Sequence, residues 1–239
     1  MDTSNLETAG NVGDQQRAQQ RSDRLEMMFT LIMAVAAIGT AWAGFESSSW
    51  GGVQSKMSAR SAALRMLSNR QAAEAGHQRT LDVITFTAWI NAINQEIQTD
   101  PSAFPANGYI PRERTGSGFL YARFRSEFKP VFEHWLAQQP LRNPAAPSTP
   151  FVMPEYRLAA QAEADAVMAE AELHGSKAEE ASQQSSRYML MSVIFALVLF
   201  FVAVGNKVRS PKSRLLLLSM SAVLLLGAVA TLASLPVVL

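Results

Sequence analysis

Three long apolar runs are the strongest feature of the hydrophobic pattern along this chain. Residues 27–45 hold no charged side chain, and the runs 188–204 and 215–239 hold none either. A helix needs about 20 apolar residues to cross a hydrocarbon core roughly 30 Å thick. The pattern therefore predicts three transmembrane helices, at residues 25–46, 188–205 and 215–239.

The first two runs differ in side-chain size. The first is rich in alanine and glycine, which let helices approach closely in lipid, so we expect it to pack against other helices. The second is bulkier and includes Phe195 and Phe200, which we expect to face lipid.

Residues 47–187, between the first two runs, have a helical pattern with few breaks. Apolar residues at steps of three and four lie on one face of a helix. They are Val83, Phe86, Ile90, Ile93 and Ile97. This helix should end near Asp100, because a proline follows and disfavours helical backbone in the residue before it. Gly51, Gly52 and Gly76 are its weak points.

A second set of apolar residues at these steps is aromatic and lies after a predicted loop at 101–116. It consists of Tyr121, Phe124, Phe128, Phe132 and Trp135. Pro130 falls inside the pattern, so we expect a kink or two abutting short helices. Residues 139–154 carry five prolines and predict an extended connection.

An alanine-rich segment, 155–187, predicts a long helix that continues without a break into the apolar run beginning at Tyr188. One face forms a seam of small residues at steps of three and four, which lets another helix approach closely. We call five of its residues the α-seam and predict that it faces a partner. They are Ala164, Val167, Ala171, His174 and Ala178.

These patterns together predict an all-α fold: three transmembrane helices, and a helical extracytoplasmic stalk of long antiparallel helices, in part a coiled coil, with short aromatic helices. No stretch alternates with a period of two for long enough to predict a sheet.

Charge near the apolar runs predicts their orientation, because lysine and arginine mark the cytoplasmic ends of membrane spans. We expect residues 1–24 to be a disordered cytoplasmic arm, 206–214 to be a basic cytoplasmic loop and 47–187 to lie outside the cytoplasm. The basic residues are Arg17, Arg21, Arg24, Lys207, Arg209, Lys212 and Arg214. A cleaved signal peptide ending near Ala41-Trp42-Ala43 is the alternative, and it also places 47–187 outside.

Three segments resemble a family of uncharacterised bacterial membrane proteins with three spans. They are TAWAGFESSSWGG at 40–52, YARFRSEFKPVFEHWL at 121–136 and PFVMPEYRLAA at 150–160. The resemblance implies a multi-pass protein of the bacterial inner membrane with a cytoplasmic N-terminus. It implies no activity, substrate or cofactor, and in relatives we expect glutamine or a similar polar residue near Glu46.

The composition argues against several classes of function. The formal net charge of +1 gives no support to nucleic-acid binding by bulk charge. The absence of cysteine excludes disulfides, thiolate metal sites and a cysteine nucleophile. His77, His134 and His174 show no metal-ligand spacing, so we expect neither a metal nor any other cofactor.

Two groups of polar residues remain as candidates. Glu46, followed by Ser47, stands at the end of the first apolar run, where an ionisable group suggests an ion or proton path. The alternative is a glutamate exposed to water at the interface. Five basic residues near the aromatic helix suggest either an anion-binding surface or local ion pairs with nearby acids. They are Arg112, Arg114, Arg123, Arg125 and Lys129.

The sequence thus predicts a non-enzymatic integral membrane protein that acts as a homo-oligomeric, accessory or scaffold subunit through its extracytoplasmic helices. Its predicted partners are the lipid bilayer, further copies of itself or other membrane subunits. The alternative is an oligomeric ion channel or transporter with Glu46 near the pore mouth. A membrane hydrolase is the weakest hypothesis, because no nucleophile–base pair can be recognised.

Overall fold

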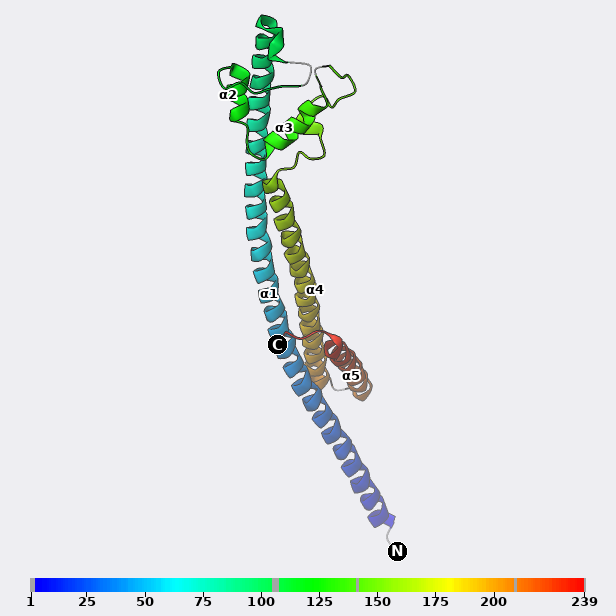
Figure 1. Cartoon of the computed structure of the whole chain (residues 1–239). Helices are drawn as coiled ribbons and strands as arrows, with labels where there is room; N and C mark the ends of the chain where they lie inside the picture. The colour runs from blue at the N-terminus through cyan, green and yellow to red at the C-terminus, as the bar shows by residue number, and fades with distance from the viewer. Residues whose placement is uncertain (1–2, 105–107, 141, 209, 239) are drawn as a thin grey trace. The chain divides into compact units, whose positions relative to one another are not determined.

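The computed structural model describes residues 3–104, 108–140, 142–208 and 210–238; side chains 3–18, 21 and 22 lie outside that description. Every regular element in these residues is a helix, which confirms the all-α prediction (Figure 1). The elements are α1 (Thr3–Thr99), η1 (Pro101–Ala103), α2 (Gly116–Ala122), α3 (Phe128–Ala137), η2 (Pro150–Val152), α4 (Ala159–Lys207) and α5 (Pro211–Ser234). Three of them, α1, α4 and α5, are long and apolar enough to cross a membrane.

Helix α1 is longer than the apolar pattern predicts. It begins at Thr3, inside the arm expected to be disordered, and it passes through all three predicted weak points. Arginine and glutamine are good helix formers, and a helix already held by its apolar part extends at little cost. Its end at Thr99 was correctly predicted: Pro101 follows, and the Asp100 side chain accepts a bond from Ser102 N.

Helix α4 runs without a break from the alanine-rich segment through the second apolar run, as predicted. Helix α5 differs from the prediction at both ends, because it begins at Pro211 and ends at Ser234. Proline at the first helical position lacks only an N–H that would have no helical partner, so it starts the helix well. Pro236 cannot continue a helix, and residues 235–238 form a non-helical tail.

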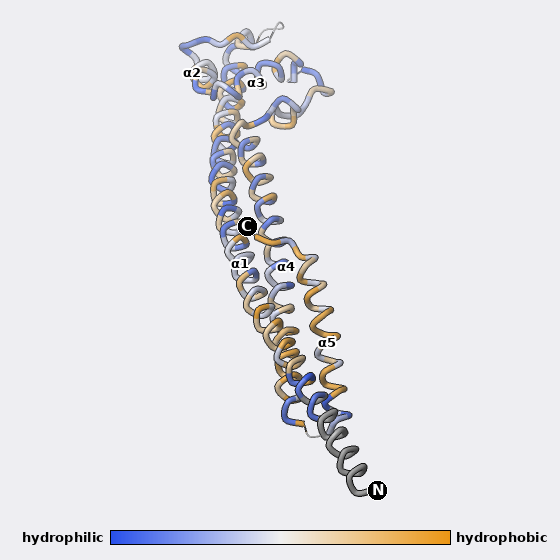
Figure 2. The backbone as a smooth tube through the Cα atoms, turned by 90° about the horizontal axis from the view of Figure 1, so that it is seen from below, coloured by the Kyte–Doolittle hydropathy of each residue, from blue (hydrophilic) through white to orange (hydrophobic). Residues whose placement is uncertain are grey.

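The chain divides into two compact units. The first unit comprises residues 1–59 and 174–239, and the second comprises 60–173. In the first unit, apolar side chains of α1, α4 and α5 share one core, and Figure 2 shows hydrophobic residues along these parts of the three helices. The buried members are Phe29, Ile32, Ala36, Ala43, Tyr188, Met191, Phe195, Val198, Val202, Leu218, Leu225 and Ala228.

Two glycines let α1 and α4 approach closely in the first unit. A Cβ atom built on Gly39 would lie 2.7 Å from the ring of Phe195, and one on Gly205 would lie 2.8 Å from the ring of Phe29. Phe195 is therefore buried against α1, and our expectation that it faces lipid was wrong. Phe200, by contrast, is exposed on the surface of the unit.

The second unit has an aromatic core between α1, α3 and the loops that flank α3. The Phe132 ring lies at its centre, with its centroid 4.8 Å from those of both Trp89 and Phe124. The aromatic pattern resolves into two helices, α2 and α3, but they do not abut at Pro130 as one of the alternatives predicted. The break falls at residues 123–127, and Pro130 lies in the first turn of α3, where a missing N–H is tolerated.

We predict that Gly39→Ala lowers the free energy of unfolding by about 1–3 kcal/mol, because the new methyl group overlaps the Phe195 ring. Gly44→Ala is the matched control on the same helix, since a Cβ there meets nothing within 4 Å. Thermal unfolding followed by circular dichroism in a non-ionic detergent measures both. Equal melting temperatures for the two variants would contradict the close approach of α1 and α4.

Candidate functional site

The predicted polar membrane site is a buried contact between α1 and the tail that follows α5. The Glu46 side chain is 0% exposed, and its Oε2 atom accepts a hydrogen bond of 3.0 Å from the backbone N of Val238. Its other oxygen, Oε1, is buried and has no hydrogen-bond partner in the part of the chain that the structure describes. We call this contact the Glu46 latch.

Neighbouring polar groups strengthen the attachment of the tail. The carbonyl oxygen of Pro236 accepts one hydrogen bond from Trp50 Nε1, at 3.1 Å, and another from the Tyr188 hydroxyl, at 3.0 Å. Because proline stops α5, this carbonyl lies outside any helix and needs partners from elsewhere. The tail is thus held by side chains of both α1 and α4.

Ser47, the second residue of the predicted membrane site, joins α1 to α4 instead. Its hydroxyl donates to the Ser185 carbonyl at 3.0 Å, and the Ser185 hydroxyl donates to the Ser47 carbonyl at 2.8 Å. Reciprocal serine bonds of this kind hold two helices together without large side chains. The Glu46 carboxyl is thus covered by the tail, and the Ser47 hydroxyl is used in the contact between α1 and α4.

Two residues of the α-seam, Ala164 and Ala171, pack against α1 of the same chain and so do not face a partner. In the second unit, Ala164 and Ala171 are buried, and their carbonyl oxygens accept 2.8 Å hydrogen bonds from the α1 residues Ser68 and Ser61. In the first unit Ala178 is also buried. Val167 and His174 are half-buried. A spacing of three and four residues predicts that a helix packs there, but does not distinguish a helix of the same chain from one of another.

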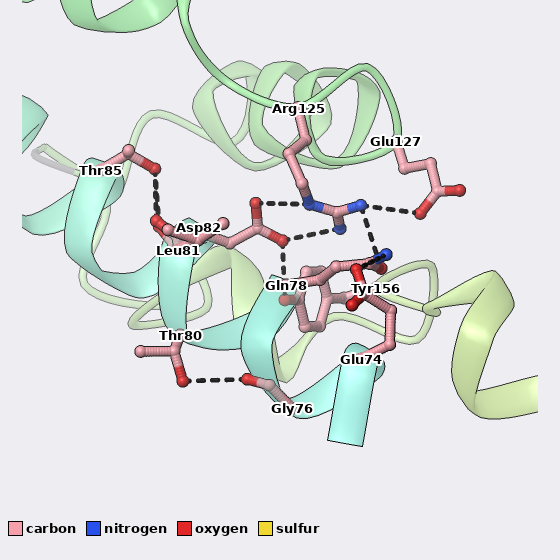
Figure 3. A network of polar contacts seen from close by, with 10 residues as sticks. All are labelled: Glu74, Gly76, Gln78, Thr80, Leu81, Asp82, Thr85, Arg125, Glu127 and Tyr156. Carbon is pink, nitrogen blue, oxygen red and sulfur yellow. Dashed lines mark hydrogen bonds and ion pairs between the residues drawn. The ribbon is translucent and has the colours of Figure 1, made fainter. Parts of the chain in front are cut away.

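A second buried carboxylate, which sequence analysis missed, organises the second unit. Asp82 on α1 is 1% exposed and accepts two hydrogen bonds from Arg125, from Nε at 3.0 Å and from Nη2 at 2.9 Å. The hydroxyl of Tyr156, just before α4, donates to Asp82 Oδ2 at 3.0 Å. Arg125 also donates from Nη1 to Gln78 and Glu127 (Figure 3). We call these five residues the Asp82 cluster.

The Asp82 cluster joins three segments that are far apart in sequence: α1, the link between α2 and α3, and the residues that lead into α4. A bidentate arginine–carboxylate pair fixes both partners in orientation, and a third donor satisfies the remaining capacity of the buried carboxylate. Removing one partner from such a pair leaves an uncompensated charge and costs about 3–5 kcal/mol. The cluster is therefore a structural clamp.

Charge and burial shift two pKa values in the cluster. The hydrogen bond to Asp82 raises the pKa of Arg125, with a further contribution from Glu127. Burial, and then the hydrogen bond to the Asp82 carboxylate, raise the pKa of Tyr156 well above its ordinary value of 10.0. Nearby, the hydrogen bond that Tyr121 donates to Glu133 raises the pKa of Tyr121 to about 12. Both tyrosines thus stay neutral and keep donating at alkaline pH.

The basic residues near the aromatic helices form local contacts, one of the two alternatives drawn from the sequence. Arg112 pairs with Asp100, at 3.7 Å, and Arg125 belongs to the Asp82 cluster. Arg123 lies over the Phe119 ring, and Lys129 donates to the Ala122 carbonyl. Arg114 is exposed on the surface.

The histidines are not brought together. His134 Nδ1 lies 3.5 Å from a Glu155 carboxylate oxygen, and both side chains are about half exposed. Among the residues described, no group of three or more histidine, aspartate and glutamate side chains is arranged to hold a metal ion.

A sequence signal for the Asp82 cluster existed. Asp82 directly precedes Val83, which we placed on the apolar face but which is exposed. The α1 residues that are buried in the second unit include positions 75, 82, 86, 89 and 93, and Asp82 continues their spacing. An acid at such a position requires a buried partner. Which of five basic residues supplies it depends on the path of the loops, which the sequence pattern does not give.

No family model, curated protein or solved structure matches this chain. The resemblance to three-span bacterial membrane proteins therefore stays a prediction, and no residue role is transferred from it.

We predict that Glu46→Leu frees the tail, because the Val238 N–H loses its acceptor. Glu46→Gln keeps an oxygen at that place and serves as the matched control. Loss of a hydrogen bond to a charged group costs about 1.5–3 kcal/mol, so amide exchange in residues 235–238 should become roughly 10- to 100-fold faster in the leucine variant. Exchange followed by mass spectrometry measures this, and the same rate in both variants would show that Glu46 does not hold the tail.

We predict that alkaline pH destabilises the second unit, in part through Tyr156. Because its pKa is higher in the folded protein than in the unfolded chain, the stability it contributes is complete below about pH 10 and is lost as the pH rises further. Unfolding free energies measured by tryptophan fluorescence should fall less steeply above pH 10 in Tyr156→Phe than in the native protein. Tyr121→Phe serves as a second comparison, and equal slopes in the native and Tyr156→Phe proteins would contradict the assignment.

Proposed function

We propose that this chain is a non-enzymatic, multi-pass protein of the bacterial inner membrane that works by assembling with copies of itself. Its three apolar helices supply the anchor. The basic residues near the spans support a cytoplasmic N-terminus, with residues 47–187 on the other side of the membrane.

One observation carries the assembly proposal: in the second unit, α1 has an exposed outer face on which small and apolar residues outnumber the two basic ones, Arg70 and His77. Met66 is 75% exposed and Ile84 is 58% exposed, and both lie outside the apolar run at 27–45. We call this face the outer seam, since its residues recur at steps of three and four. Its members are Ala63, Met66, Arg70, Ala73, His77, Leu81 and Ile84.

A second copy of the chain fits the outer seam better than an unrelated protein does. Copies anchored in one membrane by the same spans have the same orientation in it, which favours a two-fold contact between identical surfaces. Ala63 and Ala73 let two helices approach closely. Arg70 and Glu74, one turn apart at the seam, give a cation and an anion that can pair across such a contact.

The α-seam also favours the outer seam as the contact between copies. Because Ala164 and Ala171 pack against α1 of the same chain, they cannot receive a partner without opening the second unit. The outer seam needs no such opening. The channel alternative receives no comparable support, since Glu46 is covered by the tail of its own chain.

We predict that cysteines on the outer seam cross-link between copies. The chain has no native cysteine, so Met66→Cys and Ile84→Cys each introduce a single thiol. In native membranes treated with a mild oxidant, each variant should form a disulfide-linked dimer on a non-reducing gel, because a two-fold parallel contact places identical residues opposite each other.

Arg65→Cys is the control, since Arg65 is exposed on the same helix and lies about 100° around it from Met66, outside the outer seam. It should remain monomeric under the same treatment. Absence of a dimer for both seam variants, with a monomeric mass in lipid nanodiscs, would contradict self-assembly. A cross-link to a different protein at these positions would instead make the chain an accessory subunit.

A further inference from the structure

The second unit contains an open groove beside the Asp82 cluster. Its volume is about 550 Å³, and it lies between α1 and the residues that lead into and begin α4. Pockets that bind small molecules typically have volumes of about 300–1,000 Å³. The groove is therefore large enough for a small organic ligand.

Small residues keep the groove open. Ala72, Ala75 and Gly76 line it from α1, and Ala162 lines it from α4. A Cβ atom built on Gly76 would meet no other atom within 4 Å, so this glycine borders empty space. Larger side chains at these positions would fill the groove, as they fill the aromatic core farther along α1.

The chemistry of the lining combines apolar surface with cationic groups. Phe151 and Leu158 extend the apolar surface, and Arg79 and Arg157 add two guanidinium groups. In the described part of the chain neither arginine forms an ion pair, and the guanidinium of Arg157 donates only from Nε, to the Pro154 carbonyl at 3.2 Å. Both guanidinium groups thus keep N–H donors for an anion.

The net charge of the groove lining indicates the charge of the ligand. Asp165 also lines the groove, where its Oδ1 atom accepts a hydrogen bond of 2.8 Å from Gln161. Two arginines and one aspartate leave a single positive charge. A ligand with one negative charge therefore neutralises the lining, whereas a dianion exceeds it.

The wall of the groove is fixed in place by the clamp. Tyr156 lines the groove, and its hydroxyl is held by Asp82, which is itself held by Arg125. Phe151 packs its ring on those of Phe128 and Tyr156, with centroids 5.3 Å and 5.1 Å apart. A wall that is already ordered binds a ligand without a further cost in side-chain entropy.

From these observations we infer that the groove binds a small monocarboxylate with an apolar body. Its carboxylate accepts hydrogen bonds from Arg79 and Arg157, and its body lies on the alanines and on Phe151. Arginine is suited to this role because its planar N–H groups match the geometry of a carboxylate. The inference is independent of self-assembly, since the outer seam lies on a different face of α1.

The test is calorimetric titration of the full chain in phosphatidylcholine nanodiscs, with empty nanodiscs as the blank. Three probes separate the contributions: 4-phenylbutanoate carries both parts, acetate carries the carboxylate alone, and 4-phenylbutanol replaces the charge by a hydroxyl. We expect 4-phenylbutanoate to bind at least about tenfold more tightly than either of the others, and to bind less tightly as salt is raised.

Three variants locate the binding. Arg79→Gln and Arg157→Gln should each weaken binding of 4-phenylbutanoate about tenfold, because each removes a charged donor. Gly76→Leu should block the groove while leaving the charges in place and the fold intact, since its side chain enters empty space and leucine favours helix. Arg65→Gln is the matched control, as this exposed arginine of α1 does not line the groove.

Circular dichroism and the melting temperature show whether each variant is folded. Absence of detectable binding to the native protein would overturn the inference. So would binding that persists in Gly76→Leu and both arginine variants, or that weakens equally in Arg65→Gln. Equal affinity for 4-phenylbutanoate and 4-phenylbutanol would overturn the role of the two arginines.

Discussion

The close packing of α1 against α4 through small side chains is the contact on which both units depend. In the first unit, Gly39 admits the Phe195 ring. In the second, the hydroxyls of Ser61 and Ser68 reach carbonyl oxygens in the N-terminal part of α4. Such bonds form only where two helices lie close together. Close packing of this kind stabilises helices in water and also in lipid, where apolar burial gives no advantage.

Helix α1 buries one carboxylate in each unit, and the two are satisfied to different degrees. Asp82 accepts hydrogen bonds at both oxygens from Arg125 and Tyr156, so its charge is compensated in full. Glu46 accepts a bond from Val238 at one oxygen, and the other has no partner among the described residues. The first arrangement makes a rigid clamp, whereas the second holds a short tail by one strong contact and its neighbours.

In the second unit, α1 presents two distinct faces. One face carries the groove, whose wall includes Tyr156 of the Asp82 cluster. The other carries the outer seam, with Met66 and Ile84 exposed. Self-assembly through the outer seam leaves the groove open in each copy. The proposals for the two faces are thus compatible and can be tested separately.

Periodicity alone predicted the helices, because the spacing of apolar residues and the prolines act on backbone nearby in sequence. The end of α1 before Pro101 and the unbroken α4 are of this kind, whereas the break between α2 and α3 falls at residues 123–127 and not at Pro130. The partners of each face were decided only by tertiary structure. The alanines of the α-seam could equally have met a foreign helix, Phe195 could have faced lipid, and Glu46 could have faced water. Each outcome depends on contacts between residues more than 90 positions apart in sequence, such as Ser68 with Ala164 and Glu46 with Val238, which local pattern does not encode.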